Sequence, residues 1–270
     1  MSATVTGADI TQAIQATDLS NSIVCLHSSL KSLGHVEGGA DTVIQAFLES
    51  GCTLIVPTFT YTCGVAPARW IPQNGLDMAG WRDTSEAQAY APANPMIARD
   101  MGIIPARVLL TPGRHRGQHP LNSFTALGPR AKHLITAQAP LNVYGPLKQV
   151  YASNSAYLVL LGVDLTRATA IHYAEECAGR RLFRRWAKDV ATGIVEVEVG
   201  SCSEGFNRLA PFVSWLERRV EVGTSVWRSY PFRQFIDQVT KAIRANPSIT
   251  HCDDQQCVRC RDAVRGGPLL

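Results

Sequence analysis

Two neighbouring runs, Tyr-Leu-Val-Leu-Leu-Gly-Val-Asp at residues 157–164 and Thr-Ala-Ile-His-Tyr-Ala-Glu-Glu at residues 169–176, indicate the fold. The first run is short, rich in Leu and Val, and closed by Gly162, which is typical of a buried central strand. The second run has the composition of a helix. A buried strand that leads into a helix predicts an α/β sheet, and open sheets of this class place their chemistry at the carboxyl ends of the strands.

The predicted helix carries a set of side chains suited to catalysis. Thr169, His172 and either Glu175 or Glu176 are three or four residues apart, so they share one helical face. A hydroxyl, an imidazole and a carboxylate would then converge. The alternative is a surface helix on which the histidine has no role, and the spacing allows either glutamate to reach His172.

Length and composition favour one globular domain over residues 1–270, with a cysteine-containing tail at about 246–270. The 270 residues are 46% hydrophobic, which is enough for one large core. No apolar run approaches the roughly 18 residues that a membrane span needs, and the N-terminal residues lack the pattern of a signal peptide, so we expect a cytoplasmic protein. A net charge of +4 without a basic stripe argues against nucleic acid as a partner.

The segment at residues 27–39 has the features of an anion-binding loop. It follows the predicted strand at residues 23–26, contains hydroxyls, Lys31, His35 and several glycines, and precedes a predicted helix at residues 40–49. Backbone N–H groups at such a helix start can bind a phosphate. Neither a GxGxxG nor a Walker pattern is present. The alternative is a turn whose hydroxyls satisfy its own backbone.

The remaining segments predict further elements. A buried strand is expected at residues 53–57, an edge strand at 194–199 where apolar residues alternate, and a turn into a short strand at 119–128. Amphipathic helices are expected at 8–16, 94–101, 206–219 and 232–244, and the basic run at 180–185 is expected to be solvated. The irregular stretch at 64–93 combines aromatic residues with Asp77, Asp83 and Glu86. That composition suits the wall of a site for a cationic ligand, or an ordinary surface loop.

The eight cysteines are expected to be free thiols, and the tail contains a CxxC motif. We expect no metal, because His251 and Cys252 are adjacent and do not form a regular second pair with Cys257 and Cys260. Cys202 could join the group only by folding back. The alternative is a structural metal held by those tail residues.

Four blocks in the same order resemble the antibiotic N-acetyltransferase family, whose best-known members are the aminoglycoside 3-N-acetyltransferases. The blocks are His-Ser-Ser-Leu-Lys-Ser-Leu-Gly at 27–34, Leu-Ile-Val-Pro-Thr-Phe-Thr-Tyr at 54–61, His-Pro-Leu-Asn-Ser-Phe-Thr-Ala-Leu-Gly at 119–128, and Leu-Leu-Gly-Val at 160–163 with Thr-Ala-Ile-His-Tyr-Ala-Glu at 169–175. A glycine- and cysteine-containing turn at 200–206 adds a fifth block. The resemblance extends over about residues 23–235.

The resemblance implies a three-layer α/β/α fold with a mixed sheet, and acetyl-coenzyme A as the acetyl donor. In this family pattern His172 is the general base and Glu175 orients it. The resemblance also implies a set of coenzyme A contacts: Ser28, Ser29, Leu30, Lys31, Val36, Ser123 and Phe124. Thr169, or the backbone amides of Ser29 and Leu30, would stabilise the oxyanion.

The expected reaction is transfer of an acetyl group to the 3-amino group of an aminoglycoside in a ternary complex, by a monomer or a homodimer. Asp77, Glu175 and Glu176 are expected to contact the substrate. A ping-pong route through Cys63 or Cys177 is an alternative mechanism. Two alternatives to the function are acetylation of a different amine and a non-catalytic coenzyme A-binding or zinc-linked interaction protein. The chain departs from the family in the basic loop at 114–118 and in its mildly basic charge, which leaves any acidic trough to local carboxylates.

Overall fold

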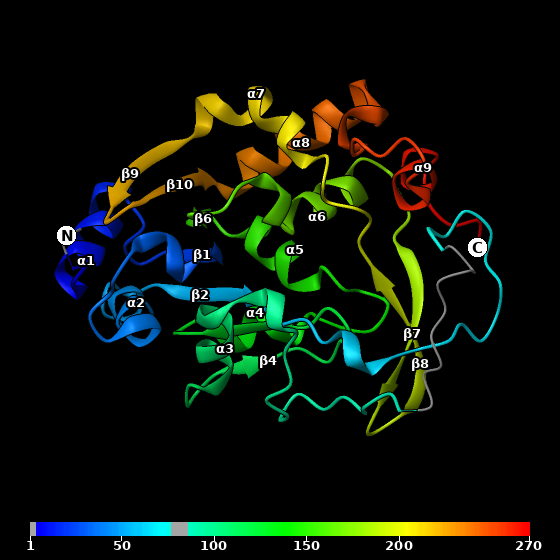
Figure 1. Ribbon diagram of the computed structural model, residues 1–270, viewed down its shortest axis with the longest axis horizontal. Coiled ribbons are helices and arrows are strands. Elements are labelled where there is room, and N and C mark those ends of the chain that lie inside the picture. The colour runs from blue at the N-terminus through cyan, green and yellow to red at the C-terminus, as the bar shows by residue number, and fades with distance from the viewer. Residues whose placement is uncertain (1–3, 77–85) are drawn as a thin grey trace.

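The computed structural model describes residues 4–76 and 86–270, and its core is a seven-stranded sheet with the order β4-β5-β2-β1-β6-β10-β9 (Figure 1). The three central strands, β1 (Ile23–Ser28), β2 (Thr53–Pro57) and β6 (Ala156–Leu161), run parallel to one another. The outer strands are antiparallel to their inner neighbours: β5 (Phe124–Leu127), β4 (His115–Arg116), β10 (Ser225–Pro231) and β9 (Arg218–Val222). The predicted mixed sheet is therefore confirmed.

Helices cover both faces of this sheet because alternate residues of its buried strands point to opposite sides. Val24 of β1 and Val159 of β6 pack with α1 (Gly7–Ala16), α2 (Gly39–Glu49) and α3 (Ile103–Leu110). Cys25 and Leu158 face the other layer, which contains α4 (Ala131–Thr136), α5 (Gly145–Ala152), α6 (Ala170–Cys177) and α8 (Phe232–Ala245). These two apolar cores and the sheet between them form the predicted three-layer α/β/α fold.

A smaller antiparallel sheet stands beside the main one, at the right of Figure 1. It has the order β3-β7-β8, formed by β3 (Gly64–Val65), β7 (Phe183–Asp189) and β8 (Gly193–Val199). β8 pairs only with β7 in the described structure, as predicted for an edge strand. The prediction of a solvated face at residues 180–185 is correct for Arg181, which is exposed, and wrong for the rest of the run. Arg180 is buried, and Phe183 begins β7, where strand pairing orders the basic residues.

Two predicted helices differ from the structure. From Asn94 to Met101 the only helical turn is the 3-10 segment η4 (Arg99–Met101). In place of one helix at 206–219, the chain makes the short turns η6 (Phe206–Leu209), α7 (Ala210–Val213) and η7 (Ser214–Leu216), and then enters β9. Phe212 and Trp215 are exposed. The apolar residues that suggested a continuous helix are therefore not all directed at the core.

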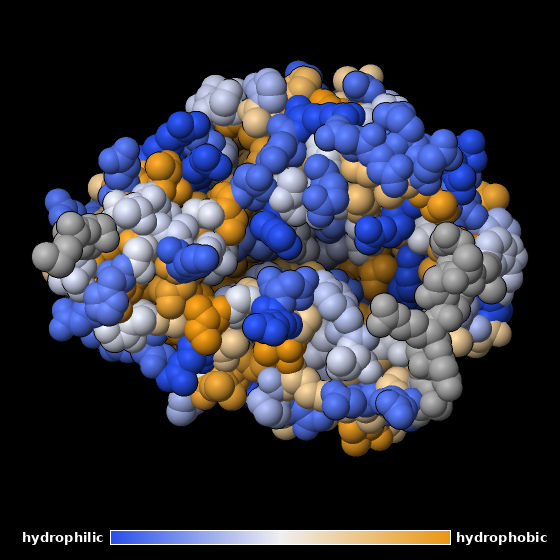
Figure 2. Space-filling model, in the orientation of Figure 1, coloured by the Kyte–Doolittle hydropathy of each residue, from blue (hydrophilic) through white to orange (hydrophobic). Residues whose placement is uncertain are grey.

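The C-terminal tail folds back along the edge of the molecule next to the smaller sheet. It contains η8 (Pro247–Thr250) and α9 (Val258–Val264). In Figure 1 α9 lies close to the upper end of β7. Figure 2 shows that, on the face seen in Figure 1, hydrophilic residues cover most of the surface and hydrophobic residues form scattered patches. Within the described residues, no helix is long and apolar enough to cross a membrane.

Candidate active site

The turn after β6 delivers the predicted catalytic helix to the carboxyl edge of the parallel strands. Gly162 ends the strand with φ of 63°, and a Cβ at this position would come within 1.8 Å of the Ser32 hydroxyl oxygen. Only glycine meets both conditions without strain. The chain then makes the short turn η5 (Leu165–Arg167) and enters α6, whose first two turns carry His172 and Glu175.

His172 and Glu175 form a buried pair. The Nδ1 atom of His172 lies 2.7 Å from Oε2 of Glu175, and the Glu175 side chain is only 2% exposed. An ionised carboxylate can only accept a hydrogen bond, so Nδ1 carries the proton. The Nε2 atom then has a free lone pair, and no group in the described part of the chain bonds to it. This is the tautomer that a general base requires.

Glu175 is held in its ionised form by the groups around it. Burial alone would raise its pKa, but the hydrogen bond with His172 and the charge of Arg180 outweigh burial, and the pKa lies below its ordinary value. Arg180 bonds to Oε1, and the hydroxyl of Ser201 donates to Oε2 at 2.9 Å. Glu175 therefore has no oxygen left for a substrate, contrary to its expected second role as a substrate contact.

The imidazole of His172 is fixed by close packing on several sides. Its ring stacks on Tyr144 at a centroid distance of 6.2 Å and meets the edge of Phe206 at 4.9 Å. A Cβ at Gly200 would lie 2.6 Å from the ring carbon Cγ of His172, so the ring rests directly on this stretch of backbone. The rotamer of His172 therefore depends on the absence of a side chain at position 200.

Glu176 faces away from the pair. Its Oε1 accepts a 2.8 Å hydrogen bond from Lys148, and the residue lines neither of the cavities described below. Of the two glutamates that the spacing allows, Glu175 is therefore the one that bonds to His172 in this structure. The expected contact of Glu176 with substrate finds no support in this position.

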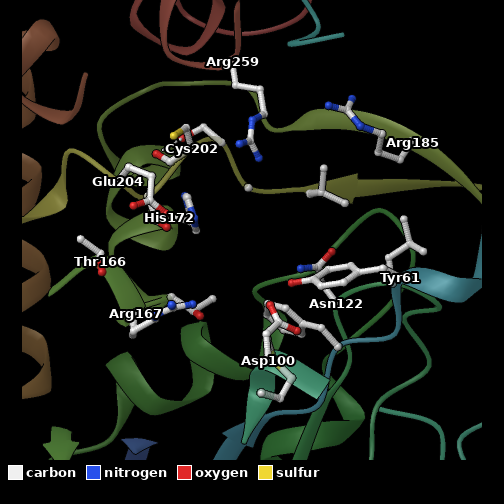
Figure 3. Close-up of a pocket in the computed structure, with 18 of the residues that line it drawn as sticks. Tyr61, Asp100, Asn122, Thr166, Arg167, His172, Arg185, Cys202, Glu204 and Arg259 are labelled. Carbon is white, nitrogen blue, oxygen red and sulfur yellow. Dashed lines mark hydrogen bonds between the residues drawn. The ribbon is translucent and has the colours of Figure 1, made fainter. Parts of the chain in front are cut away.

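His172 opens into a cavity that is lined by both polar and aromatic residues. Figure 3 shows His172 across the open space from Tyr61 and Asn122, with Arg259 pointing in from above and Asp100 and Arg167 on the lower side. The lining also contains Thr166, Arg185, Ser201, Cys202 and Glu204. Three arginines and two carboxylates therefore line the cavity into which His172 opens.

A second cavity lies at the loop that the sequence predicts for an anionic cofactor. It is lined by Ser28, Ser29, Leu30 and Lys31, as the family resemblance implies, and by Gly102 and Ile103 at the start of α3. His27 also lines it, and burial lowers the pKa of this histidine to about 4, so it is neutral near pH 7. The hydroxyl of Ser28 is buried without a hydrogen-bond partner in the described structure, which leaves it available to a ligand.

The two cavities meet at α6. Five residues line both of them: Thr169, Arg167, Phe59, Asp100 and Met101. A ligand in the second cavity can therefore extend toward His172 past Thr169, whose side chain makes no capping bond to its helix. The backbone N–H of Ser29, one candidate for the oxyanion, already donates to Leu161 O at 2.9 Å. Of the three candidates, the Thr169 hydroxyl and the backbone N–H of Leu30 remain.

Several predicted residues do not reach either cavity. Val36 packs in the apolar core, and Ser123 and Phe124 are fully buried; the Ser123 hydroxyl donates to the Thr58 carbonyl at 2.8 Å. β5 begins at Phe124 and is covered on both faces by core residues, so Phe124 cannot contact a ligand, and the hydroxyl of Ser123 just before the strand is already bonded. Asp77 lies outside the described residues.

Cys63 and Cys177, the nucleophiles of the ping-pong alternative, line neither cavity, and burial raises the pKa of each thiol.

Sequence reasoning missed the residues that come from distant loops. Asn122 and Leu121 line the first cavity in place of their neighbours Ser123 and Phe124, and Asn122 follows His119-Pro120 in one of the resemblance blocks. Glu204 lies within the glycine- and cysteine-containing turn. The position of Arg259, which lies within the CxxC motif, could not be predicted from the local sequence, because only the fold brings the tail to this cavity.

Comparisons with known proteins agree with this arrangement. The model of the family described as aminoglycoside 3-N-acetyltransferase matches residues 25–244. The chain belongs to this family. Aminoglycoside N(3)-acetyltransferase IX of Micromonospora chalcea is 33% identical over 168 residues, which cover 59% of this chain and 57% of that protein. The chain thus matches a little under three fifths of the length of that relative.

Solved structures of aminoglycoside acetyltransferases share the fold. AAC(3)-IVa has a TM-score of 0.79 and 22% identity, with 98% of this chain and 99% of that chain covered; a variant of it has been solved in complex with a gentamicin. AAC-IIIb, in a binary complex with CoASH, has a TM-score of 0.73 and 21% identity over 90% of this chain and 97% of that one. At these identities the likeness establishes the fold.

Proposed function

We propose that the chain is an acetyl-coenzyme A-dependent N-acetyltransferase that acts on the 3-amino group of aminoglycosides by direct transfer. The observation that carries this proposal is the free Nε2 of His172, held by the bond from Nδ1 to Glu175, in a cavity that joins a second one at Thr169. A base, a donor site and an acceptor site therefore meet at one place. Membership of the family supports the reaction type.

Coenzyme A fits the second cavity. Lys31 and Arg167 supply positive charge for its phosphates, and α3 begins at this cavity with no side-chain cap on its N-terminal N–H groups. The unpartnered Ser28 hydroxyl offers a further hydrogen bond. The related AAC-IIIb binds CoASH, which supports the same ligand here.

The transfer follows from the positions of the side chains. Nε2 of His172 takes a proton from the substrate amine, and the amine nitrogen forms a bond to the thioester carbonyl carbon. The carbonyl oxygen becomes an oxyanion, to which the Thr169 hydroxyl can donate. The carbon–sulfur bond then breaks, and the proton passes from the imidazolium to the coenzyme A thiolate. The products are the amide and free coenzyme A, and the imidazole is neutral again.

An aminoglycoside presents several ammonium groups, and two carboxylates of the first cavity can receive them. Asp100 and Glu204 stand on different sides of the opening (Figure 3). Both carboxylates are identified as lining residues by the structure, in keeping with a trough formed by local carboxylates. The complex of the related AAC(3)-IVa variant with a gentamicin supports this class of substrate.

The arginines of the same cavity favour a second candidate, an amine that also carries an anionic group. The side chains of Arg167 and Arg259 make no hydrogen bond or ion pair to the described part of the chain, and the side chain of Arg185 hydrogen-bonds only to backbone carbonyls there. Unpaired guanidinium groups are suited to a carboxylate or a phosphate. Such a substrate would place its acidic group toward Arg259 and its amine toward His172.

Thiol release from acetyl-coenzyme A separates the two candidates. With a panel of aminoglycosides we expect turnover, and Glu204→Gln should raise KM for the aminoglycoside about tenfold with little change in kcat, since one ammonium contact is lost. Glu221→Gln, at an exposed position on β9, is the matched control. Turnover restricted to amines with a carboxylate or phosphate, and lost in Arg259→Ala, would establish the second candidate. Binding of coenzyme A without turnover of any amine would refute both.

A further inference from the structure

Four cysteines from two distant parts of the chain come together: one lies in the loop after β8 and three lie in the C-terminal tail. The sulfur atoms of Cys202, Cys252, Cys257 and Cys260 all lie within 4.8 Å of one another. Sequence reasoning favoured a metal-free tail because three cysteines and an adjacent histidine made an irregular set. The fold changes that set, since the loop after β8 supplies Cys202 as the fourth sulfur.

We propose that these four cysteines bind one structural zinc ion as thiolates. Zn–S bonds of about 2.3 Å in a tetrahedron place the sulfurs about 3.8 Å apart, so the observed cluster needs only a slight contraction. A CxxC pair, here Cys257 and Cys260 at the start of α9, is the usual donor of two such ligands. The other two come from the loop and from the segment before α9.

The surroundings of the sulfurs fit a metal site. Cys202, Cys252 and Cys260 are at most 5% exposed, and the backbone N–H of Cys252 donates to Sγ of Cys260 at 3.3 Å. A backbone donor of this kind stabilises a metal-bound thiolate. His251 is outside the group; its Nδ1 lies 2.9 Å from the carbonyl oxygen of Cys252. The site is therefore assigned to four sulfurs and no nitrogen.

The proposed site joins the tail to the loop that supports the catalytic pair. Ser201, next to Cys202, bonds to Glu175, and Arg259, between two of the ligands, lines the substrate cavity. A Cβ at Gly205 would meet the carbonyl oxygens of Thr250 and His251 at 2.4 Å each, so the loop and the tail already touch through their backbones. Zinc would fix this contact and with it the approach of Arg259 to the substrate.

Metal analysis of the purified full-length protein tests the proposal. Protein produced with zinc in the medium and without a metal-affinity step should contain about one zinc per chain, and Cys202→Ser and Cys257→Ser should each lower that content at least about tenfold, since a four-ligand site loses one thiolate. Cys177→Ser, at a cysteine outside the group, and His251→Ala should retain it. Loss of zinc in His251→Ala with retention in Cys202→Ser would overturn the ligand assignment.

Replacing zinc with cobalt in the wild-type protein gives a further test, and its result does not depend on whether a variant folds. After removal of zinc by a chelator under reducing conditions, addition of Co²⁺ should produce the intense sulfur-to-metal absorption and the visible bands of a tetrahedral cobalt–thiolate site. The chelated protein should also expose four more reactive thiols and melt at a lower temperature, because a ligand of the folded state has been removed. No zinc in the purified protein and no cobalt spectrum, or a disulfide found between Cys257 and Cys260 by mass spectrometry, would overturn the proposal.

Discussion

At the scale of single residues, two adjacent glutamates have different environments, although their spacing in the sequence gives both the same chance of contacting His172. Glu175 is buried and bonds to His172, Arg180 and Ser201, whereas Glu176 bonds to Lys148. Helical spacing of three and four residues brings both within reach of His172. Only the direction of the helix relative to the sheet distinguishes them, and that direction is a property of the tertiary fold.

The Glu175→Gln variant should lose activity through kcat. An amide can donate to Nδ1 of His172 and so favour the tautomer with the proton on Nε2, and we expect kcat to fall about a hundredfold while KM for acetyl-coenzyme A changes little. Steady-state kinetics measures this split. Glu176→Gln is the matched control and should stay within a fewfold of the wild-type kcat. Equal losses in the two variants would contradict the assignment of Glu175.

Prediction of the site from the sequence worked best where function and local pattern coincide. The helix with His172 and the loop at Ser28 are evident from spacing and composition, because each lies within one continuous segment. The resemblance implies Ser123 and Phe124 as cofactor contacts, yet both are fully buried at the start of β5, and the neighbouring Asn122 lines a cavity instead. Burial of a short strand depends on which elements cover it, and local sequence does not contain that information.

At the scale of elements, the loop after β8 holds α6 and its proposed catalytic pair in place. Gly200 lies against the His172 ring and Ser201 bonds to Glu175, so this loop contacts both members of the pair. The sequence predicted the edge strand before the loop. It did not predict the contact with α6, since strand and helix are brought together only when the smaller sheet docks beside the main one.

Replacing Gly200 with alanine should impair catalysis without unfolding the protein. The added Cβ would lie 2.5 Å from the Tyr144 hydroxyl and 2.6 Å from the His172 ring, so the imidazole has to move. A displacement of about 1 Å at a catalytic group can cost about a hundredfold in rate, and we expect a fall in kcat of about ten- to a hundredfold. Thiol release and thermal melting are measured together.

Gly7→Ala is the control for this substitution. A Cβ at Gly7 meets its nearest atom, in Thr42, at 3.4 Å, which is ordinary contact, and the position is remote from the site. This variant should keep the wild-type rate. If Gly200→Ala were equally active, the close packing of the ring would have no part in catalysis.

The helix predicted at residues 206–219 shows where periodicity misleads. Residues 206–219 contain apolar side chains at helical spacing, but Phe212 and Trp215 are exposed and the chain turns into β9 at Arg218. Residues 232–244 have the same kind of pattern and do form the long helix α8. The difference lies in packing: the apolar face of α8 is buried in the core on one face of the sheet, whereas the earlier segment leaves two of its aromatic side chains exposed.

At the scale of the whole molecule, two fully buried histidines make stability depend on pH. Burial lowers the pKa of His27 and of His119 to about 4, from an ordinary value of 6.5. His119 accepts N–H bonds from Leu121 and Asn122 at Nδ1 and lies 2.8 Å from the Glu198 carbonyl at Nε2, so its neutral form is built into the fold. Between pH 6.5 and pH 4 the unfolded chain therefore binds more protons than the folded one.

Because the unfolded state gains protons in this window, the free energy of unfolding falls as the pH is lowered from 6.5 toward 4. At pH 5 the loss amounts to roughly 2 kcal/mol for each histidine. Urea unfolding of His119→Gln at pH 7 and at pH 5 should show a difference between the two pH values that is smaller than in the wild type by about that amount. His133→Gln, at an exposed position on α4, should leave the difference unchanged. A stability that does not vary over this range would contradict the buried neutral state.

The whole fold also distinguishes the proposed base, His172, from the two other buried histidines. His27 lines the second cavity and His119 is bonded at both ring nitrogens, whereas His172 lines the first cavity with a bonded Nδ1 and with an Nε2 that has no partner in the described part of the chain. The measurement that decides this point is thiol release from acetyl-coenzyme A with an aminoglycoside, for the wild type and for His172→Ala, with His115→Ala as a control at an exposed histidine. We predict that kcat of His172→Ala falls at least about a hundredfold while the protein stays folded and still binds coenzyme A. Turnover within a fewfold of the wild type would show that His172 is not the base.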